Sequence, residues 1–121
     1  ALPHINLASA YEKRGALDGA ISHMKEAARL ASRDAKVRDQ LGLLYGERGM
    51  FEEAVTELQS AVDLNPDSAE ALNALGMAYG QTGRLAQAED AFRSALASDP
   101  AFARAAANLE KLRAMRAGEK R

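Results

Sequence analysis

Residues 69–102 read AEALNALGMAYGQTGRLAQAEDAFRSALASDPAF, and residues 35–68 directly before them follow the same pattern. Both stretches contain Leu-Gly-x-x-Tyr, a glycine four positions after the tyrosine, and a proline near the end that follows Asn or Asp. Six columns recur at a step of 34 residues: Leu7, Leu41 and Leu75; Tyr11, Tyr45 and Tyr79; Gly15, Gly49 and Gly83; Ala20, Ala54 and Ala88; Met24, Leu58 and Phe92; and Ala27, Ala61 and Ala95. Such a period indicates stacked copies of one supersecondary unit.

The apolar spacing inside each unit predicts two helices. Leu72, Leu75 and Tyr79 fall at i, i+3 and i+7, which places them on one face of a helix. A second apolar stripe runs from Leu85 to Leu96. Glycine at the junction can adopt the left-handed conformation that closes the first helix, and proline ends the second. Each unit is therefore predicted to be a helix-turn-helix, with Gly15, Gly49 and Gly83 at the turns.

These motifs resemble the tetratricopeptide-repeat (TPR) family, although its opening aromatic column is replaced by His4, Arg38 and Leu72. The resemblance implies an all-α, right-handed solenoid of three units, at residues 1–34, 35–68 and 69–102. A capping helix is expected at residues 103–117 and a tail at 118–121, which gives one domain with seven helices. Ala106, Leu109 and Leu112 should face inward on the capping helix, and Asn108, Lys111 and Arg116 outward.

In this family the first helices of the units line a concave groove that binds peptides, so the resemblance implies a groove here. Carrying the family's groove columns onto this sequence gives the following candidate peptide-binding residues: Leu2, Ile5, Ser9 and Glu12 in the first unit; Lys36, Asp39, Leu43 and Gly46 in the second; Glu70, Asn73, Met77 and Gly80 in the third; and Arg104 and Lys111 in the capping helix. This lining mixes apolar side chains with charges of both signs.

The same columns indicate whether the groove could bind an acidic C-terminal peptide or could bind peptide backbone through side-chain amides. Some co-chaperone members grip an acidic C-terminal peptide through lysine, asparagine and arginine at places occupied here by Ile5, Ser9, Glu70 and Ala74, so heat-shock chaperone tails are not predicted as ligands. The column that could bind peptide backbone through amides reads Asn6, Gln40 and Ala74. Gly46 and Gly80 fall within predicted helices, where glycine is unfavourable. They indicate either close approach of a ligand or a small residue tolerated near a helix end.

Composition excludes several other classes of function. Sixteen basic and seventeen acidic residues among 121 give a net charge of −1, which argues against nucleic acid as the main partner. No apolar run approaches the roughly 20 residues of a membrane-spanning helix, so no membrane insertion is expected. The chain has no cysteine for a disulfide or thiolate metal site, and its compartment stays open.

The residues do not suggest an enzyme or a cofactor site. His4 and His23 are the only side chains that titrate near neutral pH, and no nucleophile accompanies them in a recognisable pattern. The adjacent pairs Glu52–Glu53 and Glu89–Asp90 do not face each other on a helix. Residues 103–121 carry four more positive than negative charges, which favours a solvated capping helix over a contact with an acidic partner.

The leading hypothesis is therefore a protein-interaction scaffold that binds a peptide or protein segment in its groove. Because the chain enters a repeat at Ala1, an excised piece of a longer protein is favoured. One alternative is a substrate-recruiting segment of a larger enzyme, such as a glycosyltransferase. Another is self-association into homo-oligomers through the edge of the first unit, where Leu2, Pro3 and Ala10 would otherwise meet water.

Overall fold

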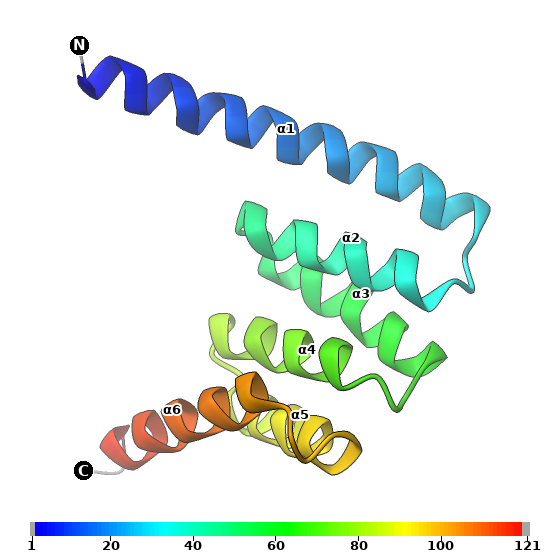
Figure 1. The fold of residues 1–121 in the computed structure, drawn as a ribbon, viewed down its shortest axis with the longest axis vertical. Helices are drawn as coiled ribbons and strands as arrows, with labels where there is room; N and C mark the ends of the chain where they lie inside the picture. Colours follow the sequence, from blue (N-terminus) through cyan, green and yellow to red (C-terminus); the bar gives the residue numbers. More distant parts are fainter. Residues whose placement is uncertain (1, 120–121) are drawn as a thin grey trace.

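The computed structural model describes the backbone of residues 2–119 and the side chains of residues 13–118. This part of the chain holds six helices and no strand: α1 Leu2–Leu30, α2 Ala35–Arg48, α3 Phe51–Leu64, α4 Ala69–Gln81, α5 Leu85–Ser98 and α6 Ala103–Glu119. They stack in chain order from α1 to α6 (Figure 1). The prediction of an all-α helical repeat fold is confirmed, and the prediction of seven helices is wrong. None of the helices in residues 2–119 is long and apolar enough to span a membrane.

The second and third units are helical hairpins, α2 with α3 and α4 with α5. At both turns a glycine has the left-handed conformation expected from the sequence, with φ of 85° at Gly49 and 80° at Gly83. The side chains of Asp34 and Ser68 cap the starts of α2 and α4, where they accept hydrogen bonds from backbone amides. α3 and α5 end just before Asn65-Pro66 and Asp99-Pro100, as the prolines predict.

Two further glycines allow the paired helices to approach closely. A Cβ atom at Gly42 would lie 2.5 Å from Leu58 Cγ, and one at Gly76 would lie 2.6 Å from Phe92 Cε1. Both distances are far shorter than a carbon–carbon contact at its optimum of about 3.5–4.0 Å. The 34-residue columns therefore encode a specific contact, in which the large residue of the second helix packs on a glycine of the first.

We expect Gly76→Ala to lower the free energy of unfolding by roughly 1–3 kcal/mol, because the buried Phe92 ring must shift to admit the methyl group. Gly80→Ala is the matched control. A Cβ atom at Gly80 meets nothing within 4 Å, and alanine favours the helix by up to about 1 kcal/mol. Urea unfolding of both variants measures the difference. Equal stabilities would show that α4 and α5 are not in the close contact described.

The first unit does not form the predicted hairpin. α1 continues without a break through Gly15, which lacks the positive φ of Gly49 and Gly83. The sequence around Gly15 explains the difference, since Glu12 stands where the other units have Gly46 and Gly80, and Ala16 and Leu17 follow directly. These residues favour a helix, and one glycine inside a helix costs only about 1 kcal/mol. Figure 1 shows the N-terminal part of α1 extending past the end of α2.

The continuous helix leaves one side of the first unit uncovered. Met24 is equivalent to Leu58 and Phe92, yet it is only half-buried, and so are Ala20 and Ala27. A hollow of about 260 Å³ lies between α1 and α2, lined by Met24, Gln40, Leu43 and Leu44. The α2-facing side of α1 is packed, because Ile21 and Ala28 are buried in one cluster with Leu41 and Tyr45 of α2, and Met24 packs against this cluster.

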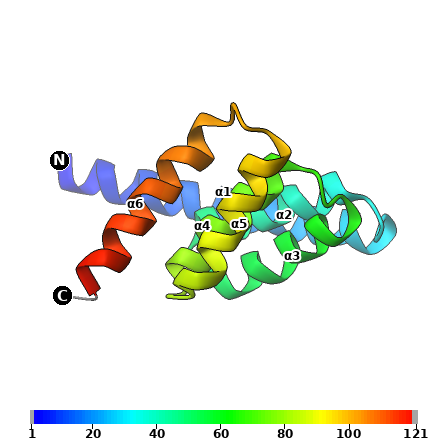
Figure 2. The ribbon, with the colours of Figure 1, turned by 90° about the horizontal axis from the view of Figure 1, so that it is seen from below.

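At the C-terminal end α6 lies beside α5, descending from the turn that joins them (Figure 2). Ala105, Leu109 and Leu112 are buried there against residues of the third unit. Ala106 is exposed, so its predicted inward orientation is wrong, and the inward stripe begins at Ala105 instead. Buried apolar side chains of α6 thus cover the last hairpin of the stack.

Candidate peptide-binding groove

The described part of the predicted groove lies on α2, α4 and α6. Lys36, Glu70, Arg104 and Lys111 are exposed, and Asp39 is half-buried. Ile5, Ser9 and Glu12 lie outside the side chains that the structure describes, as does Leu2. The clearest apolar positions are Leu43 on α2 and Met77 on α4, which keep 45% and 53% of their surface exposed. Large apolar side chains at this exposure are candidates for contact with a partner.

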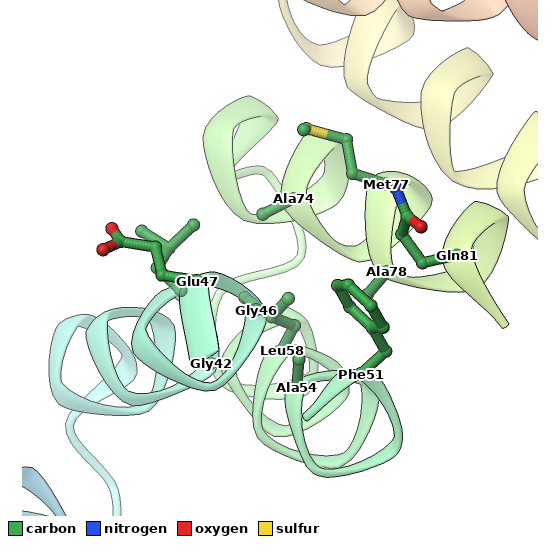
Figure 3. Close-up of a pocket in the computed structure, with 11 residues that line it drawn as sticks. Gly42, Gly46, Glu47, Phe51, Ala54, Leu58, Ala74, Met77, Ala78 and Gln81 are labelled. Atoms are coloured by element: carbon green, nitrogen blue, oxygen red, sulfur yellow. The ribbon is translucent and has the colours of Figure 1, made fainter. Parts of the chain in front are cut away.

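Leu43 and Met77 both border a hollow of about 370 Å³ between α2, α3 and α4. We call it the α2–α4 hollow. Its lining is mostly apolar and consists of Gly42, Leu43, Gly46, Glu47, Phe51, Ala54, Leu58, Ala74, Met77, Ala78 and Gln81. In Figure 3 the ring of Phe51 reaches from the start of α3 toward α4, while Ala74, Met77 and Ala78 form the opposite wall. Its volume and apolar lining are within the range of pockets that bind ligands.

Three of these lining residues, Leu43, Gly46 and Met77, were predicted from the sequence as groove positions, whereas Phe51 was missed. A signal for Phe51 was present, because Leu17, Phe51 and Leu85 form a further apolar column with a step of 34 residues. Gly46 is not required by packing, since a Cβ atom there would meet nothing within 4 Å. A side chain at position 46 would instead narrow the hollow. This observation favours the interpretation in which Gly46 allows close approach of a ligand.

Two carboxylates lie at the other end of the same wall. Asp39 on α2 is half-buried, and its Oδ1 atom is inaccessible to solvent and has no hydrogen-bond partner. Burial raises the pKa of Asp39 above its ordinary value, and the negative charge of Glu70 on α4 raises it further. The neighbouring Lys36 lines a small recess together with Asp39 but forms no ion pair with it. The Oδ1 atom of Asp39 is therefore left without a hydrogen-bond partner in the described chain.

Asn73 is buried, although the sequence predicted that it would line an open groove. Only 6% of its surface is exposed, and its side-chain oxygen accepts a hydrogen bond of 3.0 Å from Nδ2 of Asn108 on α6. The amide nitrogen of Asn73 lies 3.8 Å from the sulfur of Met77. Asn108 is thus half-buried and turned toward α4, and its predicted outward orientation is wrong. The Asn73–Asn108 pair fixes α6 to α4, because a buried amide needs a hydrogen-bonding partner.

The positive charges of α6 are largely engaged within the molecule. Glu89 of α5 is 17% exposed and lies 3.2 Å from Arg116 and 3.8 Å from Arg113, as well as 3.6 Å from Arg93. The guanidinium of Arg104 lies 5.1 Å from the centre of the Phe102 ring. The prediction that Arg116 faces outward is therefore wrong in part, since it reaches back to α5. A cationic site for an acidic partner is not favoured here.

The described residues do not form a recognisable catalytic or metal site. His23 is exposed on α1, and His4 lies outside the described side chains. Glu52 forms an ion pair of 2.9 Å with Arg84, so this carboxylate has a structural contact. No group of three or more histidine, aspartate or glutamate side chains in the described part is arranged to hold a metal ion.

Comparison with known proteins agrees with this architecture. Sequence profiles described as tetratricopeptide repeat match residues 40–101 and residues 4–38. The chain belongs to the tetratricopeptide repeat family. No curated protein sequence matches this TPR protein significantly. The match at residues 4–38 includes the first unit, in which α1 is continuous.

Several solved TPR structures resemble this chain. The first TPR domain of Spaghetti (RPAP3), bound to the HSP90 peptide SRMEEVD, is 22% identical with a TM-score of 0.82, over 90% of this chain and 86% of that one. The second TPR domain of human RPAP3, in complex with the HSP70 peptide SGPTIEEVD, is 21% identical with a TM-score of 0.79, over 93% and 94%. A thermophilic TPR protein of Thermus thermophilus is 29% identical with a TM-score of 0.74, and the match covers 84% of this chain and 52% of that protein.

Proposed function

We propose that this TPR protein is a protein-interaction module that binds a peptide or protein segment along the groove formed by α2, α4 and α6. The observation that carries the proposal is the α2–α4 hollow, where Leu43 and Met77 are exposed beside the buried core of the second and third units. Exposed apolar side chains around a preformed concave surface favour binding without a large ordering cost.

The structural relatives support a peptide ligand, because RPAP3 domains of the same fold are bound to HSP90 and HSP70 peptides. The ligand proposed here is different. Glu70 and Ala74 occupy places in the third unit where the family's acidic-tail binders carry cations, and Asp39 adds a second carboxylate next to Glu70. An acidic tail would meet like charge at this wall, which disfavours binding.

Self-association through the first unit is a second candidate. It is supported by the hollow of about 260 Å³ between α1 and α2 and by the half-exposed Met24. An apolar surface of this kind can be covered by a second copy of a chain. Light scattering over a range of protein concentrations distinguishes this association from binding of a peptide. A role as the recruiting segment of a larger enzyme stays a prediction.

Binding is expected to weaken by more than tenfold, about 1.4 kcal/mol, when Leu43 and Met77 are both changed to glutamate. The two carboxylates would replace exposed apolar surface on opposite walls of the α2–α4 hollow, so helicity should persist. The measurement is fluorescence anisotropy with labelled peptides selected from a random-peptide display library on the complete 121-residue chain.

The control for this prediction must lie on the opposite face of the stack. Glu57 and Arg93 are unsuitable, since Glu57 bonds Arg38 at 2.8 Å and Arg93 lies near Glu89. Glu53 and Thr56 are both exposed on α3. Glu53→Lys with Thr56→Glu therefore alters charge on that face. Binding that survives the Leu43 and Met77 changes but is lost in the control variant would place the site on the α3–α5 face.

A further inference from the structure

The α2–α4 hollow and the carboxylates of Asp39 and Glu70 are parts of one wall. α2 and α4 run in the same direction (Figure 1), and in both helices the carboxylate comes first and the hollow follows. Asp39 precedes Gly46 by seven residues, and Glu70 precedes Met77 by seven residues. At 1.5 Å per residue this separation is about 10 Å, or two helical turns. Both helices therefore present the same two features in the same order.

The hollow is large enough for a bulky side chain. Its volume of about 370 Å³ exceeds by more than twofold the roughly 150 Å³ of an apolar protein cavity that accommodates benzene. Phe51, Leu58 and Met77 supply apolar surface around it, and Gly46 leaves it open. An aromatic or leucine side chain would be removed from water there, which favours the complex because burial of apolar surface is stabilising.

Acidic side chains outnumber basic ones around the hollow. On the α2 and α4 part of the wall Asp39, Glu47 and Glu70 lie with one exposed base, Lys36, whereas Arg104 and Lys111 of the groove lie on α6. Asp39 does not cap α2, because Asp34 does, and Oδ1 of Asp39 has no hydrogen-bond partner. A buried acceptor without a partner is unfavourable for folding. Unfavourable groups of this kind are concentrated at binding sites, where a ligand satisfies them.

From these observations we propose that the groove binds a peptide segment in the polyproline II conformation that carries an arginine or lysine three positions from a large apolar side chain. The basic group lies between Asp39 and Glu70, and the apolar side chain fills the α2–α4 hollow. Three residues of a polyproline II helix make one turn and rise about 9 Å, so the two side chains lie on the same face at nearly the separation found along the two helices. The inference rests on the proposed function, and it adds the chemistry of the ligand.

The test uses the 121-residue chain and four sets of fluorescein-labelled octapeptides. Each set contains both orders of the two varied positions along the peptide. The first set carries arginine and, three positions away, leucine or phenylalanine. In the second set glutamate replaces arginine, in the third serine replaces the apolar residue, and in the fourth both are serine. Fluorescence anisotropy should show the first set binding at least tenfold more tightly than each of the other three.

Asp39→Asn tests the contribution of the carboxylate, and Glu53→Gln on the exposed surface of α3 is its control. Asp39→Asn should weaken binding of the first set by about tenfold and leave the second set unweakened. The pKa of Asp39 is raised in the folded chain, so its ionised form destabilises the fold at pH values above that pKa, and the destabilisation disappears as pH falls through it. Asp39→Asn should therefore raise the melting temperature at pH 7, whereas Glu53→Gln should change neither property.

The outcomes separate this inference from the proposed function. If the second set binds as tightly as the first, or if Asp39→Asn leaves binding of the first set unchanged, the proposed ligand chemistry is wrong. Sensitivity of the remaining binding to the Leu43 and Met77 changes would then still support groove binding. If no set binds at concentrations up to about 1 mM, a free energy of about −4 kcal/mol, the inference is wrong, and the display-selected peptides test the groove proposal independently.

Discussion

Deleting residues 103–121 is expected to cause aggregation or partial melting of the third unit. The deletion removes Leu109 and Leu112, which are buried in one cluster with Ala88 and Phe92 of α5, and Ala105, which is buried with Leu72 and Ala95. Each fully buried leucine or phenylalanine contributes roughly 1.5–3 kcal/mol. The combined loss is comparable with the roughly 5–15 kcal/mol that separates a typical folded domain from its unfolded state.

Polar contacts make the same end of the molecule depend on α6. Without α6, Asn73 loses the hydrogen bond from Asn108, and Glu89 loses Arg113 and Arg116. Circular dichroism melts and light scattering on the chain that ends at residue 102 measure the effect. Deletion of residues 119–121 alone is the control, since it retains the buried stripe of α6. A monomeric shortened chain with the melting temperature of the 121-residue chain would contradict the capping role of α6.

The sequence predicted those features of the fold that depend on neighbours close along the chain. Gly49 and Gly83 adopt the left-handed conformation, and α3 and α5 end before their prolines, because these conformations are set by two or three residues. The contacts of Gly42 with Leu58 and Gly76 with Phe92 were also predictable, since both partners recur at the same step in adjacent units.

The features that the sequence did not predict depend on local helix preference around each glycine and on contacts between helices. The repeat columns contain neither kind of information. Gly15 matches Gly49 and Gly83, yet α1 is continuous, because the residues flanking Gly15 favour a helix more strongly than those in the other units. The bond between Asn73 and Asn108 joins residues 35 positions apart and depends on the orientation of α6. The missing partner of Asp39 is likewise a property of the surrounding helices.

We expect Tyr45→Ala to lower the free energy of unfolding by roughly 3–5 kcal/mol, the range for emptying a large aromatic site. Tyr45 keeps only 5% of its surface exposed, in the cluster that joins α1, α2, α3 and α4. Tyr79→Ala should also be strongly destabilising, because Tyr79 packs against both this cluster and the one beneath α6. Tyr79 is only half-buried, so its loss should cost less than that of Tyr45.

The contribution of the Tyr79 hydroxyl can be separated from that of its ring. The hydroxyl donates a hydrogen bond of 3.2 Å to the side-chain oxygen of Gln59, so Tyr79→Phe should cost about 0.5–1.5 kcal/mol. Leu30→Ala is the control for loss of apolar volume, since Leu30 is 72% exposed and its truncation should change stability by no more than about 0.5 kcal/mol. Thermal and urea unfolding give all four values. If Tyr45→Ala is no more destabilising than Leu30→Ala, Tyr45 is not in the core, and the assignment of the tyrosine column to the interior of the stack is wrong.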